Sequence, residues 1–231
     1  MSELVGFELD GPVAVITMDD GKANALSHDM MAALDGALDR AEAEAKAVLL
    51  TGREGRFCAG FDLRVMMQGP EAAMKMLADG GDLLLRLYLL GLPLVVACNG
   101  HALAGGVLLA ATGDTRIGAR GAFKLGLNEV ANGMPVPVLA YEFARDRLLP
   151  SELVAATMQA RIYDPDEAAR AGWLDRVVEP DALAAAAREE AARLAALPGT
   201  AYRLSKRGLR GKVADYIRAN LAKNMDEIRR G

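Results

Sequence analysis

The stretch that decides the fold is Leu94-Val-Val-Ala-Cys-Asn-Gly-His-Ala-Leu-Ala-Gly-Gly-Val-Leu-Leu-Ala-Ala-Thr-Gly-Asp-Thr-Arg-Ile-Gly-Ala119. It reads as an apolar strand, a Gly-rich turn, a short apolar helix over about 104–112, and another strand at 115–119. A strand, a helix and a strand in this order are typical of the α/β class. We therefore predict an α/β core around this stretch.

The residues before this stretch extend the same pattern. Strand-like runs at 5–9 and 13–18 are joined by Asp10-Gly11-Pro12, which predicts a hairpin. Ser27 is placed to cap a helix with Met and Leu at helical spacing. A short buried strand at 47–51 and a Leu-rich helix at about 71–90 follow.

The residues after Pro135 are mostly helical in character. We predict helices at about 136–147, 151–158, 165–171, 181–197 and 200–229. This pattern favours a core over 1–180 and a helical C-terminal region over 181–231. The apolar stripes of that region predict that it packs on another surface, for which a neighbouring subunit is the candidate.

Composition limits the classes of function. The chain has 231 residues and a formal charge of −4, which disfavours nucleic acid as the main partner. Cys58 and Cys98 have neither the number for a disulfide framework nor the spacing of a zinc site. We see no signal peptide, and the most apolar stretch, 83–97, is too interrupted to predict a membrane span, so a reducing cytoplasm is expected.

Two segments combine a strand end, glycine and a helix start. These are Arg56-Phe-Cys-Ala-Gly-Phe-Asp-Leu63, where Asp62 can cap a short helix, and Cys98–Leu109 with Gly105 and Gly106. Such a turn leaves backbone N–H groups free at the positive end of a helix. A simple tight turn explains the first segment equally well, and close helix–strand packing explains the second.

The third segment is Leu125-Gly-Leu-Asn-Glu-Val-Ala-Asn-Gly-Met-Pro-Val-Pro137. Glu129 lies there among apolar neighbours. A carboxylate in such a setting is ion-paired, caps a backbone group, or takes part in chemistry.

In this order, the motifs Phe57-Cys-Ala-Gly-Phe-Asp-Leu, Asn99-Gly-His-Ala-Leu-Ala-Gly-Gly and Gly126-Leu-Asn-Glu-Val resemble the crotonase (enoyl-CoA hydratase/isomerase) superfamily. The resemblance extends to Lys22-Ala-Asn-Ala-Leu and to the segment 167–178. It implies a spiral of ββα units with a helical C-terminal region, an acyl-CoA substrate, and a homotrimer or a hexamer made of two trimers. No metal or redox cofactor is implied, and coenzyme A enters as part of the substrate.

The resemblance also implies roles for individual residues. The N–H groups of Phe61 and Gly105 would form an oxyanion hole for a thioester enolate. Hydratases of the family use two glutamates, and the two matching positions here are Leu108 and Glu129. A leucine at the former position and Gly-Leu-Asn-Glu at the latter resemble the Δ3,Δ2-enoyl-CoA isomerases, with Glu129 as a single base of raised pKa.

The CoA moiety would lie near Lys22, Ala23 and Ala59, as the resemblance implies. The basic segment 203–212, which includes Lys206, is either a solvated helix face or a contact for CoA phosphates. Two other functions stay open: an enoyl-CoA hydratase of fatty-acid oxidation with an atypical second polar group, for which Asn132 and Glu142 are candidates, and a catalytically idle acyl-CoA-binding protein.

Overall fold

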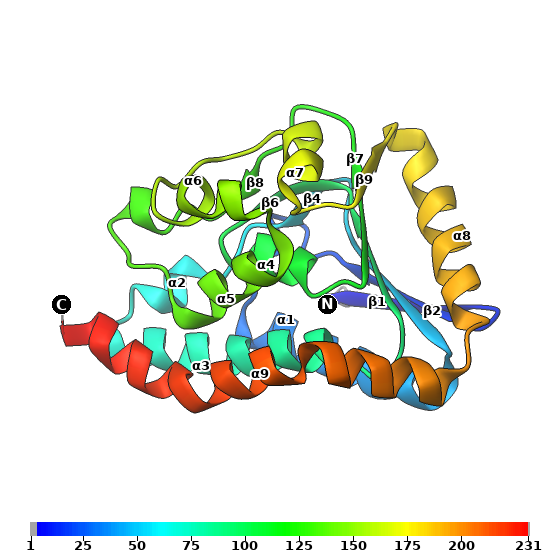
Figure 1. The fold of residues 1–231 in the computed structure, drawn as a ribbon, viewed down its shortest axis with the longest axis horizontal. Coiled ribbons are helices and arrows are strands. Elements are labelled where there is room, and N and C mark those ends of the chain that lie inside the picture. Colours follow the sequence, from blue (N-terminus) through cyan, green and yellow to red (C-terminus); the bar gives the residue numbers. More distant parts are fainter. Residues whose placement is uncertain (1–3, 231) are drawn as a thin grey trace.

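The computed structural model describes residues 4–230, and within them the strands form two sheets (Figure 1). The larger sheet has the order β1-β2-β3-β5-β7-β9, and the smaller has the order β4-β6-β8. β1 pairs with β2 antiparallel, and the other named strand pairs are parallel. The strands are β1 (Val5–Asp10), β2 (Val13–Met18), β3 (Ala47–Gly52), β4 (Gly55–Cys58), β5 (Leu94–Cys98), β6 (Gly100–Leu103), β7 (Thr115–Ala119), β8 (Leu125–Gly126) and β9 (Arg176–Val178).

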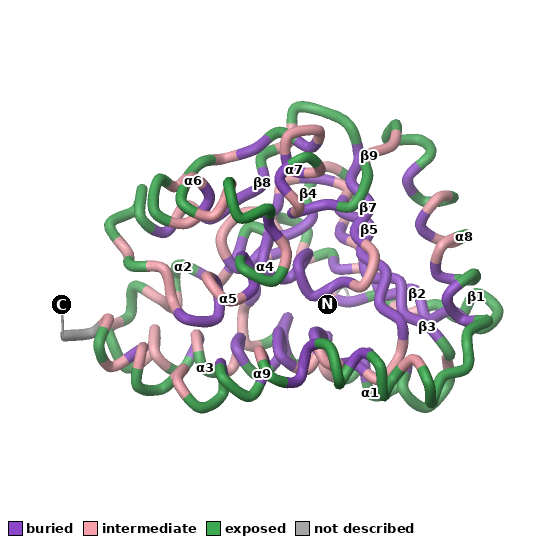
Figure 2. The backbone as a smooth tube through the Cα atoms, viewed as in Figure 1, coloured by how far each residue is buried: buried purple, intermediate pink, exposed green. Residues whose placement is uncertain are grey.

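The larger sheet is buried on both faces, as the purple tube of its central strands indicates (Figure 2). Side chains alternate across a strand, so Val48 and Leu50 of β3 join one apolar cluster while Leu49 joins the other. This two-sided burial explains why β3 and β5 are continuous apolar runs rather than alternating ones.

The helices and 3₁₀ turns cover these faces (Figure 1). They are α1 (His28–Glu44), α2 (Leu63–Met66), α3 (Pro70–Tyr88), α4 (Gly105–Ala111), η1 (Val130–Asn132), α5 (Val138–Arg147), η2 (Pro150–Glu152), α6 (Leu153–Thr157), α7 (Pro165–Ala171), η3 (Pro180–Ala182), α8 (Leu183–Ala195) and α9 (Gly199–Arg230). Ser27 Oγ accepts the N–H of Met30 and Asp62 accepts that of Arg64, so both predicted helix caps are confirmed.

The region after residue 181 packs on its own chain. α8 lies against β2, β3, β5 and β7, where Leu183, Ala187 and Leu194 bury an apolar face. α9 lies against α3 and α5 and runs along the edge of the molecule (Figure 1). Within residues 4–230, no helix has both the length and the apolarity that crossing a bilayer requires.

The smaller sheet was not predicted, and its glycines explain why. Residues 99–104 read as a turn, yet Gly100–Leu103 is strand β6. A Cβ on Gly100 would lie 2.2 Å from the carbonyl carbon of Gly55 on the paired strand β4. The close approach therefore requires the residue type that weakens a strand signal.

Candidate active site

The first glycine turn follows β4. Gly60 has φ +93°, a region that favours glycine. Leu26 N–H donates to Gly60 O (2.8 Å) and Asp62 N–H donates to Leu26 O (3.2 Å). Phe61 N–H lies between these two bonds and finds no acceptor within residues 4–230.

The second glycine turn joins β6 to α4. Ala104 has φ +50° and ψ −123°, an uncommon conformation for a residue with a Cβ. Its N–H donates to Gly126 O at 2.9 Å, which anchors the turn to β8. Gly105 is the first residue of α4, and in the described part of the chain its N–H also lacks an acceptor.

The two turns are in contact. A Cβ on Gly60 would lie 2.9 Å from Leu103 O and 3.2 Å from Gly105 N. A Cβ on Gly105 would lie 3.1 Å from the ring of Phe61. The structure thus brings the Phe61 and Gly105 segments together, and a larger residue at Gly60 would push them apart.

A cavity of about 530 Å³ opens beside these turns. Its lining is mostly apolar: Ala59, Phe61, Leu63, Met66, Met67, Pro70, Ala73, Met74, Leu77, Ala104, Leu108, Asn128, Glu129, Asn132, Gly133, Met134, Pro135, Pro137, Leu139, Leu221, Met225 and Ile228. Glu129 is the only ionisable side chain among these described residues. An apolar cavity with few polar groups is typical of a small-molecule site.

Glu129 enters the cavity just before η1. Its side chain is buried, and its Oε2 has no hydrogen-bond partner within residues 4–230. Burial raises the pKa of Glu129, while the N–H groups of Asn128 and Glu129 itself act in the opposite direction. Of the three sequence alternatives, this geometry disfavours the ion pair: the nearby N–H groups of Asn128 and Glu129 are compatible with capping, and the unpartnered Oε2 is compatible with a chemical role.

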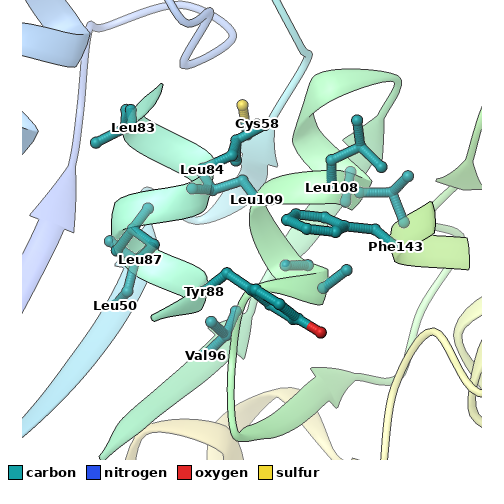
Figure 3. Close-up of a cluster of buried hydrophobic side chains, with 14 of the residues drawn as sticks. Leu50, Cys58, Leu83, Leu84, Leu87, Tyr88, Val96, Leu108, Leu109 and Phe143 are labelled. Carbon is teal, nitrogen blue, oxygen red and sulfur yellow. The ribbon is translucent and has the colours of Figure 1, made fainter. Parts of the chain in front are cut away.

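Leu108 occupies the position that, by the resemblance, matches the first of the two glutamates of the hydratases. It belongs to α4, is 1% exposed, and lies near Leu109 and Phe143 in the apolar cluster (Figure 3). It presents no polar atom that could hold a water in the cavity.

The predicted CoA residues fall into two groups. Ala59 N–H donates to Ala23 O at 3.1 Å, so Ala23 and Ala59 are neighbours, and Lys22 beside them is exposed. Lys206 has a different role: its buried ammonium donates to Asp114 Oδ2 (2.8 Å) and to Leu92 O (3.3 Å). We therefore leave Lys206 out of the candidate CoA site.

Three further residues are assigned by their contacts. Cys58 is fully buried, accepts the N–H of Gly60, and has its pKa raised to about 12 by burial, so its thiol is inert at neutral pH. Glu142 pairs with Arg145 outside the cavity, whereas Asn132 lines it.

Sequence reasoning missed two contributions. Asn24, fully buried, donates to Met18 O and Arg56 O and so fixes the loop that carries Lys22 and Ala23. Leu221, Met225 and Ile228 of α9 line the cavity, and their i, i+4, i+7 spacing was the available signal.

Comparison with known proteins agrees with this geometry. The family profile described as "Enoyl-CoA hydratase/isomerase" matches residues 8–228. A short-chain-enoyl-CoA hydratase of Clostridium acetobutylicum is 34% identical over 90% of this chain and 82% of its own. The mitochondrial enoyl-CoA delta isomerase 1 of Rattus norvegicus is 31% identical over 93% of this chain and 76% of its own.

The structure is also similar to a solved one. The crystal structure of an enoyl-CoA hydratase/isomerase family protein from Pseudomonas syringae superimposes with a TM-score of 0.95, at 38% identity, over 98% of this chain and 99% of that one. The predicted resemblance and fold class are both confirmed. The chain belongs to the enoyl-CoA hydratase/isomerase family, the crotonases, whose members act on acyl-CoA substrates.

Proposed function

We propose that this chain shifts the double bond of a 3-enoyl-CoA to give the 2-trans-enoyl-CoA. The observation that carries the proposal is the lone carboxylate: Glu129 is the one ionisable side chain among the described residues of the cavity wall, and Leu108 stands where hydration would need a second. The similarity to a delta isomerase is consistent with it.

The chemistry balances with one base. The Glu129 carboxylate takes a proton from C2, and the electrons of that C–H bond enter a dienolate whose negative charge rests largely on the thioester oxygen. The same carboxyl group then returns the proton to C4, and the double bond comes to lie between C2 and C3. No water is consumed, and the enzyme ends in its starting state.

The N–H groups of Phe61 and Gly105 are proposed to bind the thioester oxygen. Both lack acceptors within residues 4–230, and the two turns touch. Preorganised donors of this kind stabilise an oxyanion strongly in a site of low dielectric, and removing one costs about 10²–10³ in rate.

Burial of Glu129 supports its role as base. Because desolvation raises its pKa, the carboxylate is a stronger base than an exposed glutamate. The apolar wall, including Leu108, keeps competing water away from the dienolate. The loop around Lys22 and Ala23, with Ala59, is the proposed contact for the CoA moiety, and a homotrimer or a dimer of trimers is the proposed assembly.

Two substrates separate the candidate functions. The protein is incubated with 3-hexenoyl-CoA and, separately, with crotonyl-CoA, while formation of conjugated thioester and loss of conjugation are followed by absorbance. Isomerisation of the first without hydration of the second is the expected result. Turnover that survives Glu129→Gln unchanged would refute the role of Glu129.

An enoyl-CoA hydratase is the second candidate. Asn132 lines the cavity and offers a polar amide in place of the missing glutamate, and a short-chain-enoyl-CoA hydratase is among the relatives. Hydration of crotonyl-CoA, abolished by Asn132→Ala, would favour it. Silence on both substrates together with CoA-ester binding would instead indicate an idle acyl-CoA-binding protein.

A further inference from the structure

One wall of the cavity is built by the C-terminal helix α9. Leu221, Met225 and Ile228 line the cavity from α9, beside Ala73 and Leu77 of the first half of α3, the helix on which α9 packs. Met225, in the last two turns of α9, is only 3% exposed. The end of α9 is thus a wall of the site.

Two contacts hold this part of α9 in place. Asn224 Oδ1 accepts the N–H of Val138 at 2.8 Å and so caps the start of α5. Leu221 packs so closely on α3 that a Cβ on Gly81 would lie 2.8 Å from its Cδ2. A wall fixed on both sides sets a defined length for whatever enters the cavity.

The size of the cavity exceeds the needs of a short acyl group. At about 30 Å³ for a group the size of a water molecule or a methylene, 530 Å³ holds roughly eighteen such groups. The thioester and the thiol end of CoA use part of this space, which leaves room for an acyl chain of roughly eight to ten carbons.

The chemistry of the wall suits a flexible hydrocarbon. Methionines from four segments line it, namely Met66 and Met67, Met74, Met134 and Met225. Methionine side chains are unbranched and adaptable, so they can follow chains of differing shape. The described lining residues away from Glu129 carry no charge that would demand a polar substituent.

We propose that the substrates are medium-chain acyl-CoAs and that Met225 of α9 is the residue that limits chain length. The proposal rests on the proposed function only in taking an acyl-CoA as the ligand. The terminal carbons lie against α9, and each methylene that leaves water for the cavity tightens binding by roughly fourfold.

The test uses saturated acyl-CoAs, which bind without reacting. Dissociation constants are measured by calorimetry for butanoyl- through dodecanoyl-CoA. Affinity should rise by roughly sixteenfold for each two-carbon step up to octanoyl or decanoyl, and then level off. Affinity that is flat beyond hexanoyl would overturn the proposal. Failure of the isomerase assay would leave this series intact, so the two proposals fail separately.

Three variants locate the limit. Met225→Trp should move the plateau to shorter chains, and Met225→Ala should move it to longer ones. Ala222→Trp is the matched control, because Ala222 lies on the exposed face of the same helix and its plateau should equal that of the wild type. If neither substitution at Met225 changes the chain length at which affinity levels off, the role of Met225 is overturned. If Met225→Trp does not fold, the comparison of Met225→Ala with the wild type decides the question.

Discussion

Glu129→Gln should lower the activity of the protein and raise the free energy of unfolding. Glu129 is buried, and its Oε2 has no hydrogen-bond partner in the described residues. The amide of Gln keeps the shape of the side chain, and its Nε2 would lack a partner just as Oε2 does, but it carries no charge. Because burial disfavours the charged form, we expect the free energy of unfolding at neutral pH to rise by about 1.5 kcal/mol. For a chain of this size that is a melting temperature higher by roughly 3–6 °C.

The pH dependence fixes the sign of this effect. The pKa of Glu129 is raised in the folded state, so the unfolded chain loses the proton first. The stability associated with this group is complete below the unfolded pKa and is lost as pH rises through the folded pKa. The advantage of Glu129→Gln should therefore vanish in acid and grow towards neutral pH. Isomerase activity of the wild type should fall on the acid side as Glu129 becomes protonated.

The assay pairs thermal unfolding with turnover of a 3-enoyl-CoA. Loss of the base should lower kcat by about 10²–10⁴. Glu142→Gln is the matched control, since Glu142 pairs with Arg145 outside the cavity and its loss should leave activity intact and cost at most about 1 kcal/mol. A Glu129→Gln protein that melts lower than the wild type, or that keeps a tenth of its activity, would refute the reasoning.

Four further substitutions probe the site and its supports. Gly60→Ala places a Cβ 2.9 Å from Leu103 O at φ +93°, so kcat should drop by about 10²–10³ while circular dichroism stays native. Leu108→Glu should reduce isomerisation and introduce measurable hydration of crotonyl-CoA. Arg210→Gln should lower the free energy of unfolding by about 3–5 kcal/mol in denaturant titrations, because the buried guanidinium pairs with Asp114 and the carbonyls of Thr112 and Gly113 would lose their donors. Burial lowers the pKa of Lys206 to about 8, so between pH 8 and 10.5 the unfolded chain binds more protons than the folded one, and the free energy of unfolding rises with pH. Lys206→Met should remove that rise in denaturant titrations. It should leave acyl-CoA affinity within about twofold.

The larger sheet and most helices were predictable because their signals are local. Strands such as β5 are uninterrupted apolar runs, and the start of α1 is predicted by Ser27, whose side chain caps the helix. The three motif segments lie together in the structure because Phe61 follows β4, Gly105 follows β6 and Glu129 follows β8, and β6 pairs with both β4 and β8. Neighbouring parallel strands bring their carboxyl ends to one edge of a sheet.

The features that were missed depend on contacts far apart in sequence. The strands of the smaller sheet contain Gly100 and Gly126, which the close packing requires; glycine has a low strand propensity, so these positions weaken the strand signal in the sequence. The sequence predicted Lys206 to be part of a basic face, because its partner Asp114 lies 92 residues earlier in the chain and nothing near Lys206 indicates the buried pair. Likewise, the sequence of α9 shows an apolar stripe without indicating that the stripe faces a cavity.

Helix α4 links the proposed oxyanion site to the C-terminal helix α9. α4 begins at Gly105, and the carbonyls at its other end are bound by arginines: Arg147 donates to Ala111 O and Gly113 O, and Arg210 donates to Thr112 O and Gly113 O. Cations at a helix C-terminus are favourable, and here they also fix the helix along its axis. Arg210 belongs to α9, whose far end carries Met225 to the cavity wall. The same helix thus supports the proposed oxyanion site at one point and lines the cavity proposed for the acyl chain at another, so we regard α9 as part of the candidate active site.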